Sequence, residues 1–245
     1  MRIQIMLKFD DKLVLPIQYN NIFQAIILKW LGDENYQKFI HDTGYEYNKR
    51  RYKMYSFSRL EGAFRMNREN KTITYFDQGK FIVSSSDDKF LNYIVNKVIL
   101  EDEIFIRNQR VSVEEVRCFN KKLKSGDKIY TKSPIVAYST FEHDGSKKTY
   151  YYSPMEKDFE TILRRNLINK FNAAYEKEPE NDEFSIKPIN NPKLRESAVV
   201  YKGTVIKGWS GEFIVEGSEE LLNMAYNAGL GSKNGQGFGC VEIGG

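Results

Sequence analysis

Cysteine is nearly absent from the chain, because only Cys118 and Cys240 occur among its 245 residues. Two isolated cysteines exclude a disulfide framework and a clustered zinc site, and such scarcity is typical of reduced, cytoplasmic proteins. Long apolar runs are also missing, and nothing approaches the roughly 20 apolar residues of a membrane-spanning helix. The apolar run within residues 1–8 is too short for a signal peptide, and Asp10 and Asp11 follow it. We therefore expect a cytoplasmic protein that does not enter a membrane.

A large excess of one charge is missing as well, since 37 Lys and Arg stand against 33 Asp and Glu. The resulting net charge of +4 and pI near 8.8 permit a nucleic-acid partner without requiring one. Aromatic residues, by contrast, are plentiful, with 16 Tyr and 16 Phe. Those that the core does not need would offer flat surfaces for base stacking. The length suits two small domains.

Glycine is concentrated near the end of the chain, where the units Gly229-Leu-Gly231 and Gly237-Phe-Gly239 flank five residues that include Lys233. Bare main-chain N–H groups beside a lysine bind phosphate oxygens well. The preceding segment has helical spacing with Ser218 as its N-cap and Gly229 as a left-handed C-terminal cap, and residues 238–243 are strand-like. Nucleotide-binding glycine loops run the other way, from strand to helix. The pattern therefore favours a phosphate-bearing ligand other than a free nucleotide, although a glycine corner without a ligand stays open on spacing alone.

Apolar periodicity predicts the same order of elements twice. The first half reads strand, helix, two strands, helix and strand over residues 3–9, 20–31, 52–58, 72–84, 89–100 and 104–119, with a short helix over 34–41. The second half has strand 135–141, a helix from Pro154 to about residue 175, strands 183–189 and 198–215, a helix after Ser218 and strand 238–243, with a break near Gly208. This order is the ferredoxin-like βαββαβ unit. We predict an α+β fold of two tandem ferredoxin-like (RRM-like) domains, residues 1–123 and 124–245, joined in the polar stretch 121–127.

The spacing of the two glycine units resembles the glycine-rich loop of the RAMP superfamily of CRISPR-associated RNA-binding proteins. Three further stretches are similar to the CRISPR repeat-processing endoribonucleases, the Cas-six family: residues 53–60 (KMYSFSRL), 133–135 (SPI) and 153–159 (SPMEKDF). The resemblance spans nearly the whole chain in the expected order. It implies duplicated ferredoxin-like domains and RNA cleavage by attack of the 2′-hydroxyl, which leaves a 2′,3′-cyclic phosphate and a 5′-hydroxyl.

Histidine is the second scarce residue type, since only His41 and His143 are present. Acid–base chemistry on RNA near neutral pH ordinarily uses an imidazole. His143 lies in the polar segment 142–145, which is typical of an exposed turn. His41 ends the predicted helix 34–41 about 100° round from Ile40, and a helix C-terminus favours an imidazolium. This alone also fits a capping histidine, but the family has a catalytic histidine at this point, so the resemblance implies a general acid or base role for His41.

Two further catalytic roles are implied by the resemblance. The family frequently has a catalytic lysine where this chain has Lys53, which would stabilise charge developing at the phosphate or hold the 2′-hydroxyl. Taken alone, Lys53 is also one more cation in the basic run 49–53. Many relatives carry a catalytic tyrosine on the first helix, where residues 25–29 of this chain contain none. Tyr45 and Tyr47 are the candidate substitutes, and because a phenol titrates near pH 10 we expect them to orient groups rather than abstract a proton.

Basic residues gather in two regions that few acids interrupt. The first contains Lys49, Arg50, Arg51, Lys53, Arg59, Arg65 and Arg68, and the second contains Arg117, Lys121, Lys122, Lys124, Lys128 and Lys132. A charge run is usually a solvated face, but together with the glycine loop and His41 these runs predict a track for phosphates. The predicted RNA-binding residues are Gly229, Gly231, Lys233, Gly237, Gly239, Arg50, Arg51 and Arg59.

These features predict a metal-independent endoribonuclease that cuts CRISPR repeat precursor RNA into guide RNA. No cluster of Asp/Glu or His/Cys suggests a catalytic metal, and no cofactor is expected. A non-catalytic RAMP-type subunit that binds guide RNA remains an alternative, because the first-helix tyrosine is missing. A nucleotide-binding enzyme that uses the glycine loop is a more distant one. The expected partner is CRISPR repeat precursor RNA, and the sequence leaves open whether the protein forms a homodimer or joins a multisubunit CRISPR effector complex.

Overall fold

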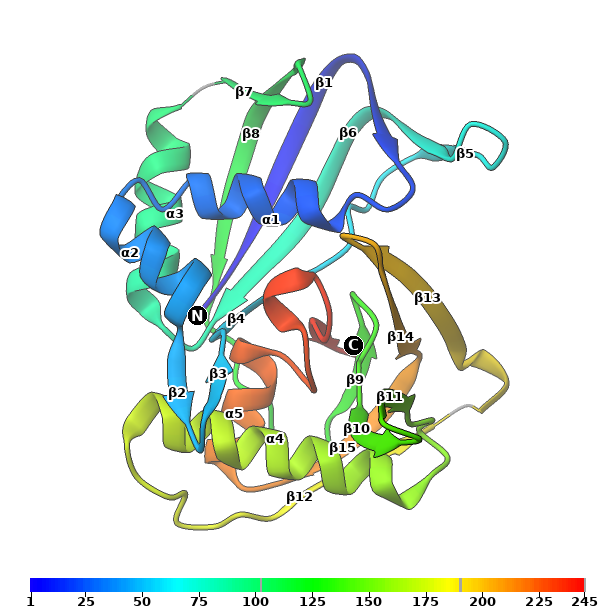
Figure 1. The fold of residues 1–245 in the computed structure, drawn as a ribbon. Helices are drawn as coiled ribbons and strands as arrows, with labels where there is room; N and C mark the ends of the chain where they lie inside the picture. The colour runs from blue at the N-terminus through cyan, green and yellow to red at the C-terminus, as the bar shows by residue number, and fades with distance from the viewer. Residues whose placement is uncertain (102, 190, 245) are drawn as a thin grey trace.

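The computed structural model describes residues 1–101, 103–189 and 191–244, and its two halves each contain an antiparallel sheet with helices packed on it (Figure 1). In the first half the spatial order of strands is β4 (Tyr55–Phe57), β6 (Thr72–Ser85), β1 (Arg2–Pro16), β8 (Gln109–Phe119) and β7 (Glu103–Ile106), with β5 (Phe64–Asn67) paired to β6. The helices are α1 (Asn20–Lys29) and α3 (Asp88–Leu100). Along the chain the order β1-α1-β4-β6-α3-β8 is the predicted βαββαβ unit.

The connection from α1 to β4 carries extra elements. It contains the short helix α2 (Glu34–Lys38), the π-turn η1 (Phe39–Thr43) and a hairpin of β2 (Tyr45–Tyr47) and β3 (Arg50–Tyr52). The hairpin is possible because Asn48 and Lys49 adopt positive φ at its tip. The predicted helix 34–41 therefore exists, but its last turn is wider than an α-helix. Such π-turns occur frequently at functional sites.

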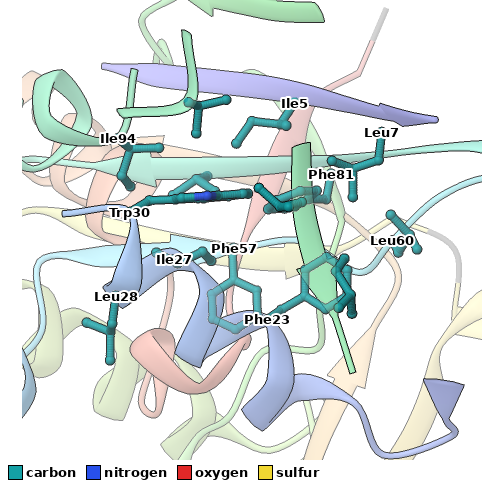
Figure 2. Packing of buried hydrophobic residues seen from close by; sticks show 14 of the residues in the cluster. Ile5, Leu7, Phe23, Ile27, Leu28, Trp30, Phe57, Leu60, Phe81 and Ile94 are labelled. Atoms are coloured by element: carbon teal, nitrogen blue, oxygen red, sulfur yellow. The ribbon is translucent and has the colours of Figure 1, made fainter. Parts of the chain in front are cut away.

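The core of the first half holds α1 firmly on the sheet. Phe23 of α1 and Trp30, which directly follows this helix, pack on Phe81 of β6, and Ile27 of α1 belongs to the same buried cluster (Figure 2). The rings of Phe23 and Phe81 meet edge to face with centroids 5.0 Å apart, and Trp30 stacks on Phe81 at 6.2 Å. Burial of each such side chain contributes about 1.5–3 kcal/mol. This packing fixes the position from which α1 presents polar side chains to the second half.

The second half repeats the unit. Its sheet has the spatial order β12 (Phe184–Pro188), β15 (Glu212–Gly217), β9 (Lys128–Thr131) and β16 (Val241–Ile243), and its helices are α4 (Lys157–Tyr175) and α5 (Glu219–Ala228). Two hairpins are inserted, β10 (Tyr138–His143) with β11 (Ser146–Tyr151) and β13 (Arg195–Tyr201) with β14 (Thr204–Ser210). Two short 3₁₀ turns, η2 (Asn191–Lys193) and η3 (Asn234–Gln236), complete it. The predicted α+β fold of tandem ferredoxin-like units is confirmed.

A buried arginine connects the two halves. Arg2 of β1 is 1% exposed, and its guanidinium donates to the carbonyl oxygens of Tyr226 (2.5 Å) on α5 and Val241 (2.6 Å) on β16. It also lies 3.9 Å from the centroid of the Tyr226 ring. Because a buried guanidinium without partners would cost several kcal/mol, these contacts hold the first strand of one half against the last strand of the other.

Three predictions for the second half are wrong. The helix expected from Pro154 begins at Lys157, since the Glu156 carboxylate accepts from the main-chain N–H of Ser153 (2.6 Å) and closes a turn ahead of it. Gly229 has φ 89° and ψ 153°, so it is not a left-handed cap. The sheet begins with β9, directly after the predicted junction 121–127 and where no strand was predicted, and residues 135–137 lie outside the named strands.

The strand predicted over 198–215 is divided in a different place. The chain reverses at Lys202 and Gly203, which have φ of 46° and 81°, so most of this segment forms the separate β13–β14 hairpin. Only β15, after Gly211, joins the sheet. The extended segment 104–119 likewise contains a turn at Arg107 and Asn108. The connection from Phe119 to Lys128 contains no named element, and the division between residues 123 and 124 stays a prediction. None of the described helices is both long enough and apolar enough to cross a membrane.

Candidate functional site

A cleft of about 810 Å³ brings the predicted histidine and the glycine loop together. His41, Arg50, Arg51 and Lys53 line it from the first half, and the segment from Gly231 to Gln236 lines it from the second. In Figure 1 the red segment that contains this loop lies beside α1, and the Asn20 amide of α1 donates to the Gln236 carbonyl oxygen at 2.8 Å. Residues separated by nearly the whole chain therefore face one space.

His41 lies in the π-turn with about half of its side chain exposed. Its Nδ1 is 2.6 Å from Oδ1 of Asp42. Because an ionised carboxylate only accepts hydrogen bonds, Nδ1 is the donor in this pair and Nε2 is the ring nitrogen left for a ligand. The bond with His41 lowers the pKa of the Asp42 carboxyl, which keeps this acceptor ionised. Sequence reasoning missed Asp42, although an acid directly after the histidine was visible.

Two anchors hold the π-turn in place. The Asp87 carboxylate accepts hydrogen bonds from the phenols of Tyr36 and Tyr45 on either side of the turn, the second at 2.6 Å. Gly44 ends the turn with φ 67°, and a Cβ there would lie 2.6 Å from the carbonyl oxygen of Tyr52. Only glycine fits this backbone without strain. The position of His41 is therefore fixed by its surroundings.

Lys53 acts on the same turn. Its Nζ donates to the main-chain carbonyl oxygen of His41 at 2.9 Å. Burial lowers the pKa of the Lys53 ammonium, and the nearby Asp42 partly offsets this effect. An ammonium group has three N–H donors, so two of them remain for other acceptors in the cleft.

Tyr45 and Tyr47 have partners elsewhere, and neither belongs to the described residues that line the cleft. The Tyr45 phenol is bound to Asp87, and burial raises its pKa. The Tyr47 hydroxyl lies 3.0 Å from a side-chain amide atom of Asn172. Nothing in the structure supports the predicted orienting role for either phenol.

A different phenol reaches the cleft. Tyr201 of β13 donates a hydrogen bond to Oε1 of Gln24 on α1, and Nε2 of Gln24 donates to the carbonyl oxygen of Gly235 at 2.6 Å. Gln24 of the first helix thus connects the Tyr201 phenol of the second half to the glycine loop. Sequence reasoning missed both residues, because no local pattern pairs positions 177 residues apart.

The glycine loop needs its glycines for main-chain reasons. Gly229, Gly231, Gly237 and Gly239 all have φ between 69° and 89°. A Cβ on Gly231 would lie 2.4 Å from the Val136 carbonyl oxygen, and one on Gly239 would lie 2.0 Å from that of Leu230. Of the five predicted loop residues, Gly231 and Lys233 line the cleft, while the other glycines shape the loop from behind.

A lysine that sequence reasoning missed supports the loop from inside. Lys170 of α4 is 2% exposed, and its Nζ donates to the carbonyl oxygens of Gly229 (2.6 Å) and Gly231 (2.9 Å) and to Oδ1 of Asn234 (2.7 Å). Burial lowers its pKa to about 7. In the sequence, Lys170 was detectable as a lysine on the apolar face of the predicted helix, one turn after Leu167.

The charge that faces the cleft has one sign. The lining contains Arg50, Arg51, Lys53, Arg165, Lys170, Lys202 and Lys233. No Asp or Glu is among the described lining residues. Arg59 is not among them either, and its guanidinium instead donates to Oδ1 of Asn20 at 2.7 Å behind the loop. The cleft is thus suited to a polyanion.

Three buried polar atoms in the cleft lack a hydrogen-bond partner among the described residues: the Tyr52 hydroxyl, Oδ1 of Asn166 and Oε1 of Gln236. Buried polar atoms in folded proteins are nearly always paired. These three atoms are therefore open to pairing with water or with a polar ligand. Within residues 1–101, 103–189 and 191–244, no three His, Cys, Asp or Glu side chains are grouped as a metal site requires.

Comparison with known proteins gives consistent results. Residues 118–243 match the family described as "CRISPR associated protein Cas6, C-terminal". The "CRISPR-associated endoribonuclease Cas6 1" of Methanocaldococcus jannaschii is 26% identical over 247 aligned positions that cover 98% of this chain and 92% of that protein. A solved structure described as "Characterization of a Cas6-related gene from Pyrococcus furiosus" has a TM-score of 0.85 at 25% identity, and covers 99% of this chain and 98% of the other. Another, "An RAMP protein binding different RNA substrates", has a TM-score of 0.84 at 23% identity with both chains fully covered.

Proposed function

We infer that this protein is an endoribonuclease that cuts CRISPR repeat RNA. The chain belongs to the family described as "CRISPR associated protein Cas6, C-terminal", because residues 118–243 match that family. The resemblance recognised in the sequence is thereby confirmed. The observation that carries the inference is the single cleft that His41 shares with the glycine loop, lined by cations and by no described acid. RNA is the polyanion that such a cleft suits, since it brings both the phosphates and a nucleophile.

The reaction that these groups fit is attack of the RNA 2′-oxygen on the adjacent phosphorus. The new bond closes a 2′,3′-cyclic phosphate, the bond from phosphorus to the 5′-oxygen breaks, and that oxygen takes up a proton. With Nδ1 bound to Asp42, a protonated His41 keeps its Nε2–H for the leaving 5′-oxygen. When His41 is the acid, water takes the 2′-hydroxyl proton. A neutral His41 would instead take that proton at Nε2 as the base, and water would supply the proton to the 5′-oxygen.

Lys53 and the loop would hold the phosphate. The two N–H groups of Lys53 that His41 does not use are donors for a non-bridging oxygen. The main-chain N–H groups of Lys233, Asn234 and Gly235 have no acceptor among the described residues, and Lys233 places its ammonium in the same cleft. Arg50 and Arg51 would follow neighbouring phosphates. In this assignment no metal takes part.

The decisive experiment compares the two histidines of the chain. His41→Ala should lower the single-turnover cleavage rate of repeat RNA by about 10²- to 10⁴-fold and leave RNA affinity nearly unchanged. His143→Ala is the matched control, because His143 is exposed at the tip of the β10–β11 hairpin, and it should cut like wild type. Cleavage should persist in EDTA, with cyclic phosphate and 5′-hydroxyl ends. Unchanged cleavage in His41→Ala would remove this residue from the mechanism.

A second candidate function is RNA binding without cleavage. It is favoured by one observation, that α1 presents Gln24 rather than a tyrosine to the cleft. This candidate expects tight repeat RNA binding and intact RNA after incubation with the wild-type protein. End-group analysis of the incubated RNA therefore separates the two functions directly.

The location and assembly of the protein are part of the same proposal. The two free cysteines fit the reducing cytoplasm, where repeat RNA is transcribed. Association with a second copy or with a multisubunit effector complex stays a prediction. Light scattering of the purified protein with and without repeat RNA measures it.

A further inference from the structure

Lys170 is a charged residue in a position built for an apolar one. It follows Phe159, Leu163 and Leu167 on the buried face of α4, and its side chain is as inaccessible as theirs. A buried ammonium without compensation is strongly unfavourable. A leucine or methionine here would avoid that cost, so the hydrogen bonds that the cation makes must explain its presence.

Those hydrogen bonds all end on the glycine loop. The three oxygen atoms around Nζ belong to Gly229, Gly231 and Asn234, at 2.6, 2.9 and 2.7 Å. An ammonium group has three N–H donors, and the loop provides three acceptors. A neutral amine has only two, so one oxygen would lose its bond on deprotonation. The loop conformation is therefore matched to the charged form of Lys170.

Asn234 extends this contact to both glycine units. Its side-chain oxygen accepts from Lys170, and its Nδ2 donates to the carbonyl oxygens of Leu230 (3.0 Å) and Phe238 (3.1 Å). Leu230 lies inside the first Gly-apolar-Gly unit and Phe238 inside the second. One ammonium thus connects α4 to both arms of the loop through a single amide.

Among the residues that the structure describes, no counter-ion neutralises this charge. Lys170 makes no hydrogen bond or ion pair with a carboxylate, and burial alone accounts for its lowered pKa. The elements packed on α4 carry these titratable or charged groups: Tyr45, Glu46 and Tyr47 of β2, Glu219, Glu220 and Tyr226 of α5, and Lys187 of β12. The cleft and the loop add His41, Arg50, Arg51, Tyr52, Lys53, Tyr138, Arg165, Tyr201, Lys202 and Lys233. Histidine is the one type among these that ordinarily titrates near neutral pH.

We propose that Lys170 is a positioning residue whose ammonium group holds the glycine loop in the conformation that receives an RNA phosphate, so that loss of its proton weakens RNA binding. This rests on the proposed function of the loop. A phosphate on the cleft side of the loop would supply the negative charge that the buried ammonium lacks, which favours the protonated form. Binding should therefore take up protons near neutral pH, and affinity should fall as the pH rises through about 7.

The test substitutes Lys170→Met, which keeps the length of the side chain and removes its charge. Lys157→Met, an exposed lysine at the start of the same helix, is the matched control. Affinity is measured by fluorescence anisotropy from pH 6 to 9 in a His41→Ala background, which prevents cleavage and removes the one imidazole in the cleft lining. We expect Lys170→Met to weaken binding about 10-fold at pH 6 and to differ little from the control at pH 9. With His41 intact, cleavage at saturating protein should change less than about 3-fold, since the residue acts on binding.

Two measurements keep the proposal falsifiable if the methionine variant folds poorly. Calorimetry of the His41→Ala protein in buffers of different ionisation enthalpy should show net proton uptake on RNA binding at pH 7.5. Hydrogen exchange of the free wild-type protein should show the amides of residues 229–239 exchanging faster at pH 8.5 than the intrinsic pH dependence accounts for. Equal affinities of the two lysine variants at every pH, no proton uptake, or pH-independent loop protection would each overturn the proposal.

The outcomes also separate this proposal from the proposed function. Wild-type protein that binds and cuts repeat RNA while the two lysine variants behave alike refutes the role of Lys170 only. Wild-type protein that binds no RNA refutes the proposed function together with the link from Lys170 to RNA affinity. Hydrogen exchange then still decides whether the ammonium holds the loop.

Discussion

The two halves have the same order of strands and helices, but they contribute different parts of the chain to the cleft. The first half contributes side chains, His41, Lys53 and the neighbouring arginines, from its connection between α1 and β4. The second half contributes the main chain of the loop between α5 and β16, supported by Lys170, together with cationic side chains such as Arg165, Lys202 and Lys233. The two copies of the fold therefore form one site from different connections, the one from α1 to β4 in the first half and the one from α5 to β16 in the second. In the proposed function the acid–base chemistry belongs to the first half, whereas both halves hold phosphates and the second half does so through its glycine loop. Each role can be tested separately.

The largest effect should come from a change to the main chain of the second half. Gly239→Ala would bring a Cβ to 2.0 Å from the Leu230 carbonyl oxygen at a residue with φ 72°. We expect the free energy of unfolding to fall by about 3 kcal/mol or more and RNA affinity to be lost. Urea unfolding and anisotropy measure both effects.

Gly145→Ala is the control for the glycine substitution. Gly145 has a similar φ of 67° at the tip of the β10–β11 hairpin, and no atom lies within 4 Å of its added Cβ. Gly145→Ala should lower the free energy of unfolding only by the conformational strain, about 1 kcal/mol, and should leave RNA binding unchanged. Equal costs for the two variants would show that the close approach in the loop is unimportant.

The next effect concerns the anchor of the first half. Asp87→Asn keeps the shape of the side chain but weakens the hydrogen bonds from Tyr36 and Tyr45, so the π-turn with His41 should loosen. We expect a loss of about 2 kcal/mol in stability and a reduced cleavage rate with unchanged RNA affinity. Asp88→Asn, an exposed neighbour on α3, should change neither. If Asp87→Asn weakened RNA binding and left the cleavage rate unchanged, the assignment of the acid–base chemistry to the first half would be wrong.

The smallest effect concerns the cations around the cleft. Arg50→Ala should make the log–log dependence of RNA affinity on salt shallower by about 0.7, the value for one phosphate of single-stranded RNA. Arg68, grouped with Arg50 in the sequence, lies on the turn after β5 and is not among the cleft residues. Arg68→Ala should therefore leave the slope unchanged. An equal change in both variants would mean that the RNA extends beyond the cleft.

The sequence was sufficient to predict what local spacing encodes. The helices and the repeated order of elements follow from apolar periodicity, and the positions of His41 and the glycine units follow from motifs. Turns at non-glycine residues with positive φ, such as Lys202 and Arg107, were missed because many residue types adopt them only in context. The contact between Gln24 and Tyr201 was also missed, because it depends on how the two halves pack. Lys170 was missed for a different reason. A lysine on the apolar face of a helix is visible in the sequence, but its hydrogen bonds to the glycine loop are not.

The buried guanidinium of Arg2 also constrains the order of events during synthesis. Its acceptors are at residues 226 and 241, so they leave the ribosome more than two hundred residues after the arginine itself. Early domains ordinarily fold while later ones are still being translated. Here the first strand must keep its cation hydrated until β16 has emerged. The core of the first half lies within residues 3–111 and can pack before that point, but the contact of Arg2 and the cleft lined by residues 231–236 form only once the last part of the chain is available.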